Sequence, residues 1–209
     1  MLNLILFAAA VAAVPSPIVP GGCTAPASEH LNEAGCYLLA EMSVEHAPKQ
    51  VYWHIFEFPD VAAAETEARK HRWSKVVSAH ASAWLYVIGE RKIPVSSGKP
   101  SAIIGPMDVP SGNTVSVRFL TSTFPPGMRT RIHSHPGSEA FYVIEGEQCV
   151  ETPTGRHRIT AGHSYIVQSG IHVQAAARGR KSLVALILPP GVAWSEPDTS
   201  WNPSQYCHR

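Results

Sequence analysis

Charge is scarce in this chain of 209 residues. Lys, Arg, Asp and Glu together make up 16% of it, and the formal net charge is +1. Proteins that bind nucleic acid or lie on anionic membranes usually carry an excess of basic residues or long runs of one sign. The charge balance therefore favours neither a nucleic-acid partner nor a membrane-surface partner.

Long apolar runs are also few. Residues 1–14, MLNLILFAAAVAAV, form an uncharged apolar stretch that ends in small residues. It is short for a membrane span, and it is similar to the apolar region of a secretory signal, although no Lys or Arg precedes it. We expect residues 1–22 to be a signal peptide and linker, with a buried first helix as the alternative. Export to a secreted or periplasmic location follows from the first interpretation, and a cytoplasmic location from the second.

Several catalytic signatures are missing. The sequence contains no G-x-S-x-G nucleophile elbow, no Walker phosphate loop and no dinucleotide-binding glycine fingerprint. Its four cysteines, Cys23, Cys36, Cys149 and Cys207, are not at zinc-finger spacing. Four cysteines in an exported protein permit disulfides in three pairings, among them a bridge between the two tails, Cys23 to Cys207. The simpler alternative for Cys149, inside an apolar strand, is a small buried side chain.

Turn-forming residues are plentiful: 18 prolines and 15 glycines. They separate short apolar runs, a pattern typical of all-β chains. In the second half the predicted strands are residues 114–123, 128–134, 140–145, 148–151, 157–160, 164–167, 172–176 and 183–188. Gly146-Glu147 is expected to be a tight turn between two of them. Such a series of short strands favours a double-sheet, jelly-roll barrel with an interior that can hold a ligand.

The first half has a different pattern. Residues 36–40, 51–58, 75–79 and 84–89 resemble strands, and residues 60–72 resemble a helix with Asp60 as its N-cap. His54 lies inside an aromatic strand, where a core role is favoured over a ligand role. We therefore expect an N-terminal α+β accessory region at 23–100, a barrel at 101–190 and a tail at 191–209 that wraps over the surface.

The chemistry is concentrated in residues 127–146, GMRTRIHSHPGSEAFYVIEG. His133 and His135 are two residues apart, so on a strand both imidazoles point to one face. The Pro136-Gly137 pair then turns the chain, which lets Glu139 return beside them. Two imidazoles and a carboxylate on one side of a sheet are a ligand set for a divalent transition metal, with Fe, Mn, Ni and Zn as candidates.

This stretch resembles the first motif of the cupin superfamily. Gly127, His133, His135, Glu139 and Gly146 stand at every fixed position of that motif. The resemblance implies a mainly β fold, the double-stranded β-helix or cupin barrel, and a metal held by the two histidines and the glutamate. Oxygenases, isomerases and decarboxylases occur among similar barrels, and many members keep the barrel while changing the site.

The second cupin motif is imperfect. Gly162 and Gly170 match it, but Gln168 stands where proline is usual, and His172 comes one residue before the ligand position, which Val173 occupies. A one-residue shift on a strand turns a side chain to the opposite face. A regular register, which we favour, turns His172 away and leaves three protein ligands. A turn one residue tighter at Gly170 makes His172 the fourth ligand.

Other basic side chains near the motif have open roles. Arg129 and Arg131 alternate with His133, so either can hold a substrate carboxylate. A solvated position at the barrel mouth is the favoured interpretation for both. His163, just before a strand, is a weaker candidate for the pocket.

Two functions remain open. The first is a metal-dependent dioxygenase or isomerase acting on a small molecule. The second is a non-catalytic module that binds a small ligand without metal, its histidines hydrogen-bonding that ligand or one another. A structural role, with barrels pairing as a homodimer, is a further possibility.

Overall fold

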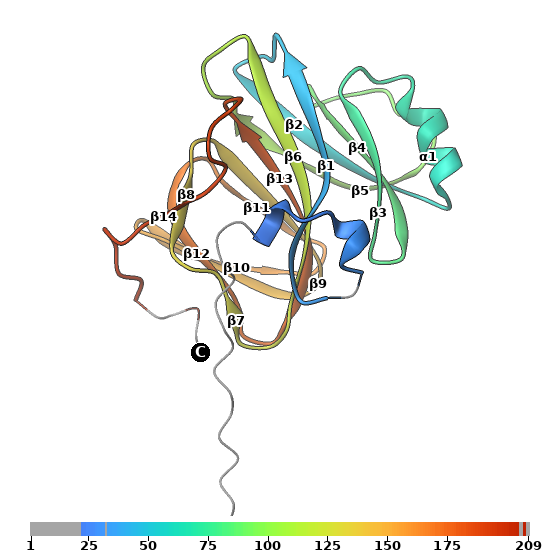
Figure 1. Cartoon of the computed structure of the whole chain (residues 1–209). Coiled ribbons are helices and arrows are strands. Elements are labelled where there is room, and N and C mark those ends of the chain that lie inside the picture. The colour runs from blue at the N-terminus through green and yellow to red at the C-terminus, as the bar shows by residue number, and fades with distance from the viewer. Residues whose placement is uncertain (1–21, 32, 205–206, 208–209) are drawn as a thin grey trace, which may run out of the picture.

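The computed structural model describes residues 22–31, 33–204 and 207, so the predicted signal segment at 1–14 lies outside the described residues. The described chain is built mostly of strands (Figure 1). Its helices are η1 (Gly22–Thr24), η2 (Ala27–Glu29) and α1 (Val61–Ala68). Its strands are β1 (Gly35–Glu45), β2 (Gln50–Phe58), β3 (Ser74–Ala79), β4 (Ser82–Gly89), β5 (Lys99–Asp108), β6 (Thr114–Phe124), β7 (Met128–Arg129), β8 (His133–His135), β9 (Ser138–Thr152), β10 (Gly155–Thr160), β11 (Ser164–Val167), β12 (Gly170–Ala176), β13 (Arg180–Leu188) and β14 (Glu196–Pro197). None of the described helices is long and apolar enough to cross a membrane.

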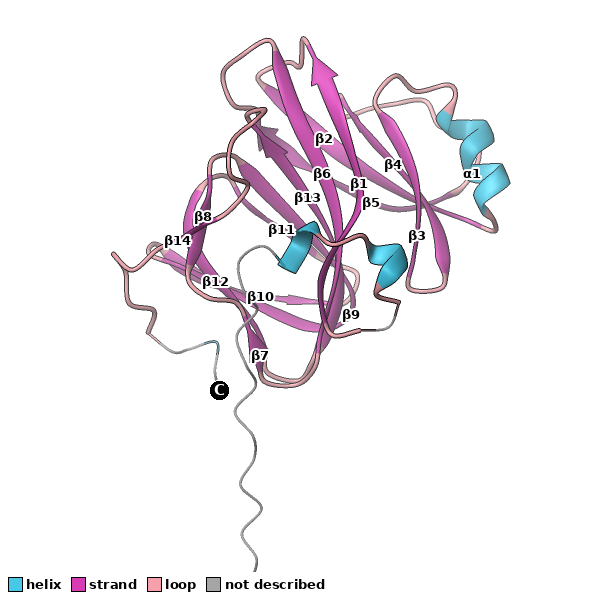
Figure 2. Ribbon diagram, in the orientation of Figure 1, coloured by secondary structure: helices cyan, strands magenta, loops and turns pink. Residues whose placement is uncertain are grey.

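The large sheet curls into the barrel. Its main path runs β1-β6-β13-β9-β12-β8-β14, and β7, β10 and β11 pair onto β12 and β9. Every pairing between these strands is antiparallel, and the curled sheet surrounds an interior (Figure 2). The prediction of a mainly β, cupin-type jelly-roll barrel is confirmed.

A smaller sheet, in the order β3-β4-β2-β5, covers the outside of the barrel and carries α1 on its far side (Figure 1). Trp53 and Tyr86 of the small sheet pack against Phe119 of the large one, and all three side chains are fully buried. His54 is buried in β2, where its Nε2 hydrogen-bonds the Glu90 carbonyl at 2.7 Å. The core role expected for this histidine agrees with that position.

Strands between the two layers are buried on both faces. On β13, Ala185 and Ile187 pack in the cluster shared with the small sheet, whereas Val184 and Leu186 pack in the barrel interior. Because successive side chains of a strand alternate between its faces, a doubly buried strand reads as a continuous apolar run. This explains why residues 183–188 contain no polar side chain.

The sheets cross the boundary expected near residue 100. β1 lies in the large sheet, where it pairs with β6, although it falls within the segment expected to be accessory. β5 lies in the small sheet, where it pairs with β2, although most of it falls within the segment expected to be barrel. Each layer is therefore completed by a strand from the other half of the sequence.

The turn expected at Gly146-Glu147 is wrong. β9 runs without interruption from Ser138 to Thr152 and passes through both glycine and glutamate. Gly146 has φ of 77°, and a Cβ there would lie 2.1 Å from the carbonyl oxygen of Gly179. Glycine is needed because the left-handed backbone bends the strand while a neighbouring backbone approaches it closely.

Candidate metal centre

Two short elements position the first three site residues. β8 carries His133 and His135 with their side chains buried, while Ser134 between them is only half-buried. The chain turns at Pro136-Gly137, and β9 starts at Ser138, so Glu139 comes back beside the histidines. The arrangement expected from the spacing of these three residues is the one the structure has.

His172 joins them, so the register favoured from the sequence is wrong. β12 begins at Gly170, which has φ of 96°, and pairs with β8 so that His172 lies directly opposite His133. Residues directly opposite each other in an antiparallel pair share a face. The two rings are 4.3 Å apart at their centroids, and His172 is fully buried. The tight start at glycine places His172 in the cluster and pairs Val173 with Glu151 on β9.

The four side chains form one compact, buried group. The potential ligand atoms of His133, His135, Glu139 and His172 all lie within 4.8 Å of one another. Their exposed fractions are 7%, 4%, 3% and 0% in that order. Three nitrogen donors and one carboxylate oxygen, gathered at this separation and sheltered from bulk water, can hold a divalent transition metal.

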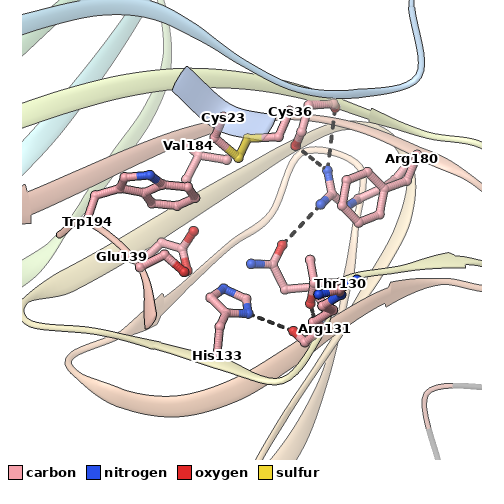
Figure 3. Close-up of a pocket in the computed structure, with 13 residues that line it drawn as sticks. Cys23, Cys36, Thr130, Arg131, His133, Glu139, Arg180, Val184 and Trp194 are labelled. Atoms are coloured by element: carbon pink, nitrogen blue, oxygen red, sulfur yellow. Dashed lines mark hydrogen bonds between the residues drawn. A yellow bond between two sulfur atoms is a disulfide. The ribbon is translucent and has the colours of Figure 1, made fainter. Parts of the chain in front are cut away.

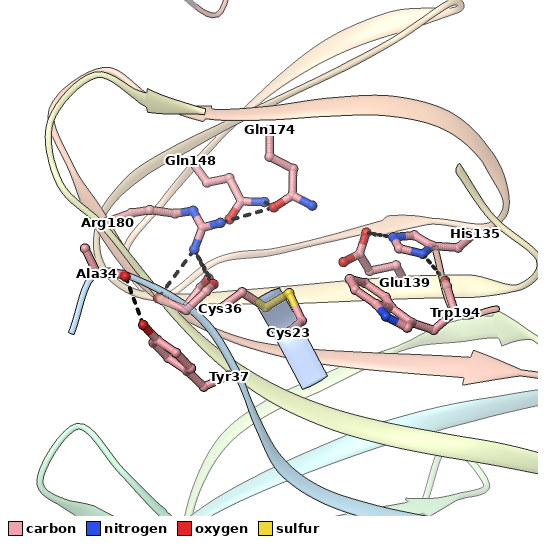
Figure 4. Close-up of a disulfide and its surroundings, with 12 residues drawn as sticks. Cys23, Ala34, Cys36, Tyr37, His135, Glu139, Gln148, Gln174, Arg180 and Trp194 are labelled. Atoms are coloured by element: carbon pink, nitrogen blue, oxygen red, sulfur yellow. Dashed lines mark hydrogen bonds and ion pairs between the residues drawn. A yellow bond between two sulfur atoms is a disulfide. The ribbon is translucent and has the colours of Figure 1, made fainter. Parts of the chain in front are cut away.

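The outer nitrogen of each imidazole bonds a backbone carbonyl. The Nδ1 atom of His133 lies 2.8 Å from the Arg131 oxygen, that of His135 lies 2.5 Å from the Trp194 oxygen, and that of His172 lies 3.3 Å from the Gly170 oxygen. Figures 3 and 4 show the first two of these bonds. A carbonyl only accepts, so each Nδ1 carries the proton, and in the neutral ring Nε2 keeps a free lone pair.

The Nε2 atoms of His135 and His172 lie close to the Glu139 carboxylate, but the hydrogen-bond geometry is poor. Glu139 Oε2 lies 3.1 Å from His135 Nε2 and 2.9 Å from His172 Nε2. Even so, His135 Nε2 and Glu139 Oε2 are buried with no aligned hydrogen bond in the described part of the chain. Buried polar atoms are rarely left in this condition, and a cation at their centre would satisfy them. The residues therefore fit a metal.

The electrostatics of the cluster agree with that fit. Burial opposes a charge on Glu139, but His135 and His172 hold the pKa of its carboxyl well below the usual range. Burial likewise opposes a charge on His135, yet the Glu139 carboxylate raises the pKa of His135. Burial, and then the charges of His172 and His135, lowers the pKa of His133 to about 3. Metal ligands bind in their deprotonated forms, so a cation would take the place of any proton held between these groups.

The cluster opens onto a pocket (Figure 3). His133 and Glu139 stand at one side of it, and Arg180 stands at another (Figure 3). The remaining lining residues are Cys23, Cys36, Ser122, Phe124, Thr130, Arg131, Gln174, Val184, Trp194 and Ser195. Its lining mixes apolar side chains with polar and charged ones.

The other basic residues considered from the sequence lie at the edge of the pocket or outside it. Arg131 lines the pocket, but its side chain is exposed, and its contribution to the cluster is the backbone carbonyl that orients His133. Arg129 is half-buried on β7 and is absent from the pocket lining. His163 is exposed, with its Nδ1 3.1 Å from the Ala161 carbonyl, and lies outside the pocket.

Sequence reasoning missed most of the lining residues, of which Trp194 and Arg180 matter most for the site, and it did not find the cysteine pairing. Trp194 stacks on His135 at 5.5 Å, and Arg180 is buried in the wall. Alternation could have identified Arg180, because it shares a strand face with Val184. The disulfides are Cys23–Cys36 and Cys149–Cys207. The tail-to-tail bridge and the unpaired Cys149 were therefore wrong, and the first disulfide lines the pocket (Figure 4).

Comparisons with solved structures return partial similarities. Solved structures that resemble the chain include a cupin superfamily protein from Desulfitobacterium hafniense, with 16% identity, a TM-score of 0.33 and coverage of 34% of this chain and 67% of that one. A cupin-2 domain containing protein from Shewanella frigidimarina has 21% identity, a TM-score of 0.31 and coverage of 33% and 68%. A salicylate 1,2-dioxygenase from Pseudaminobacter salicylatoxidans has 20% identity and a TM-score of 0.32, with coverage of 34% of this chain and 20% of that one.

A search of curated proteins finds none that matches the chain. The family model described as a cupin domain matches residues 120–189. This segment begins within β6, ends just after β13 and includes all four residues of the buried cluster. The chain therefore carries a cupin domain, which spans residues 120–189.

Proposed function

We propose that His133, His135, Glu139 and His172 bind a divalent transition metal, and that the protein is a small-molecule enzyme of the dioxygenase or isomerase type. The observation that carries this proposal is the orientation of the three imidazoles. Each ring is fixed by an Nδ1–H bond to a backbone carbonyl, which leaves Nε2 turned toward the Glu139 carboxylate. Iron, manganese, nickel and zinc all accept such a donor set.

The metal, when bound, would supply Lewis acidity or redox chemistry that no side chain offers. The protein's own residues supply the surroundings. Trp194 covers His135 and limits the access of water, while Val184 and Phe124 give apolar walls against which a small molecule can pack. Thr130 and Gln174 add polar contacts that can orient it.

One observation favours the metal-free binding module as a second candidate. The amide nitrogen of Gln174 lies 3.4 Å from His172 Nε2, so this imidazole already has a weak partner. In a metal-free pocket the histidines would bond Gln174 and the ligand. Metal analysis separates the two candidates.

The first experiment measures the metal content of the purified protein by mass spectrometry. We expect near-stoichiometric iron, manganese, nickel or zinc in the parent, and its loss from the His133→Ala, His135→Ala double variant. The His163→Ala variant is the matched control, because this histidine is exposed outside the pocket and should leave the content unchanged. Each ion is also added to the purified parent, and the melting temperature is measured, because an ion that binds the folded protein raises it. A parent that contains none of these ions and is stabilised by none of them contradicts the metal site.

We also propose that the protein functions outside the reducing cytosol. Two disulfides join its described cysteines, Cys23 to Cys36 and Cys149 to Cys207. Such bonds persist mainly in secreted and periplasmic proteins. Detection of the mature N-terminus beyond the apolar leader in exported material would support this location, whereas a cytosolic protein with four free thiols would contradict it.

A further inference from the structure

A buried arginine stands in the wall of the same pocket. Arg180 starts β13 and is 3% exposed. Its Nη1 donates to the Ser122 and Ser182 hydroxyls, each at 2.5 Å, and its Nη2 donates to Gln174 Oε1 at 3.1 Å (Figure 4). The guanidinium carbon lies 3.7 Å from the centroid of the Phe124 ring. These contacts fix the position and the plane of the guanidinium group.

No carboxylate in the part of the chain that the structure describes forms an ion pair with this cation, and Glu139 acts on it only at longer range. The ion pairs found there do not include Arg180, and its Nε is buried without a hydrogen bond. Its direct contacts are two hydroxyls, the Ser122 backbone carbonyl, an amide oxygen and an aromatic face, none of which carries a charge. Buried charges without a partner are costly, so a permanent one in a pocket wall calls for a functional reason.

The charges that line the pocket also favour an anionic ligand. Glu139 is the single acidic residue among the lining side chains, and it belongs to the metal cluster. A divalent cation bound there would more than neutralise this carboxylate. The charge of Arg180 would then remain unmatched, and the pocket as a whole would attract an anion.

We propose that the pocket takes a small organic carboxylate whose carboxylate group lies against Arg180 while the rest of the molecule faces the four-residue cluster. A planar guanidinium fork matches a planar carboxylate, and the apolar walls of Phe124, Val184 and Trp194 suit a carbon skeleton better than a hydrated phosphate. This inference deepens the proposed function and rests on it for the metal.

Gln174 limits the size of the ligand. Its Oε1 accepts from Arg180, and its Nε2 lies 3.4 Å from His172 Nε2, so a single amide group spans the distance between the cation and the cluster. A ligand that reaches both is only a few atoms long between its carboxylate and its reacting end. Long-chain acids and peptides are outside this class.

The test compares carboxylates with neutral molecules of the same shape. The full chain, loaded with metal, is titrated calorimetrically with acetate, succinate and benzoate, with acetamide, succinamide and benzamide, and with inorganic phosphate. We expect at least one carboxylate to bind about tenfold or more tightly than its amide, since hydrogen bonds to charged groups are worth that much. In Arg180→Met this preference should disappear, while the metal content stays at the parent level.

Further variants separate a binding role from a structural one. Arg180→Lys keeps the positive charge but loses the planar guanidinium group, so it should retain part of the preference for carboxylates. If Arg180→Met does not fold, the lysine variant tests whether Arg180 binds the carboxylate. Arg178→Gln removes an exposed cation that lies outside the pocket and should leave the ratio of carboxylate to amide affinity unchanged. A merely structural Arg180 would change melting temperature without changing this ratio.

Three results would overturn the inference: no carboxylate preference in the parent, a preference that survives in folded Arg180→Met, or phosphate binding more tightly than every carboxylate. The same titrations on chelator-treated protein keep the two proposals apart. If the parent holds no metal but still shows a preference that depends on Arg180, the metal proposal fails and the carboxylate site stands. If metal binds and the preference is absent, the carboxylate site fails alone.

Discussion

Each histidine of the cluster is oriented by the backbone rather than by another side chain. The carbonyls of Arg131, Gly170 and Trp194 come from three separate segments, and each accepts one Nδ1–H. Partners of this kind fix the tautomer and the ring orientation of metal-binding histidines. Because backbone carbonyls do not vary with sequence, the inward direction of the three Nε2 atoms is built into the fold itself.

Replacing His172 tests whether a bound metal is held by four protein ligands or by three. We expect His172→Ala to weaken metal binding by at least about 100-fold, more than the 10–100-fold typical of losing an outer partner. Val173→Ala is the matched control, because it also truncates a buried side chain of β12 but leaves the cluster intact. Competition with a chromogenic chelator gives both affinities. Equal affinities in the two variants would show that three ligands suffice.

The difference between His172 and the other three cluster residues shows what local sequence can predict. His133, His135 and Glu139 are brought together by a period of two and by one turn, which are both local. The strand face on which the His172 side chain lies depends on where β12 begins to pair with β8, and these strands are distant in sequence. Alternation assigns Arg180 to the strand face of Val184, but that this face borders the cluster depends on the pairing of β13 with distant strands.

At the scale of elements, α1 is tied to the loop before β5 by one buried carboxylate. Glu67 is 1% exposed and accepts from Lys70 Nζ at 2.7 Å, from the Ser96 amide and hydroxyl at 3.0 and 2.7 Å, and from the Ser97 hydroxyl at 3.0 Å. The Asp60 cap predicted the start of this helix. The helix ends at Ala68 rather than at 72, because the amides of Lys70 and His71 bond the carbonyls of Glu67 and Ala68, three residues back, in a turn that leaves the α-helix.

Replacing Glu67 should uncouple α1 from that loop. Lys70 and the serine hydroxyls lower the pKa of Glu67 far below its ordinary 4.5, against the effect of burial. A carboxyl with a lowered pKa in the folded protein stabilises it above the unfolded pKa, and that contribution is lost as the pH falls through the folded value. We expect Glu67→Gln to cost about 1–3 kcal/mol at pH 7.

The pH dependence distinguishes this carboxyl from a general packing effect. Urea unfolding of the parent should show stability falling as the pH drops below about 4.5, and Glu67→Gln should show a shallower fall because it has one titrating group fewer. Glu65→Gln, on an exposed position of the same helix, should follow the parent. Parallel curves for parent and Glu67→Gln would contradict the assignment.

At the scale of the whole molecule, a disulfide joins each end of the described chain to the barrel, and the N-terminal one lies beside the pocket. The Cys23–Cys36 bond joins residues 13 apart in sequence and lines the pocket, whereas Cys149–Cys207 closes a loop of 58. The second loop includes Trp194, whose carbonyl orients His135. The barrel was predictable because its strand pattern and first motif are local, but these pairings were not, since four cysteines allow three connectivities.

The Cys149–Cys207 bond should therefore affect the metal as well as the fold. By the chain-entropy relation, losing it costs about 4 kcal/mol and losing Cys23–Cys36 costs about 3 kcal/mol. We expect Cys149→Ser with Cys207→Ser to lower metal affinity beyond its effect on stability, because the freed tail holds Trp194 less firmly against His135. The Cys23→Ser, Cys36→Ser variant is the comparison, since none of the carbonyls that bond the cluster histidines comes from that loop. Chelator competition on folded protein at low temperature measures the affinities, and equal affinities in the two variants would show that the tail closes the barrel without orienting its histidine.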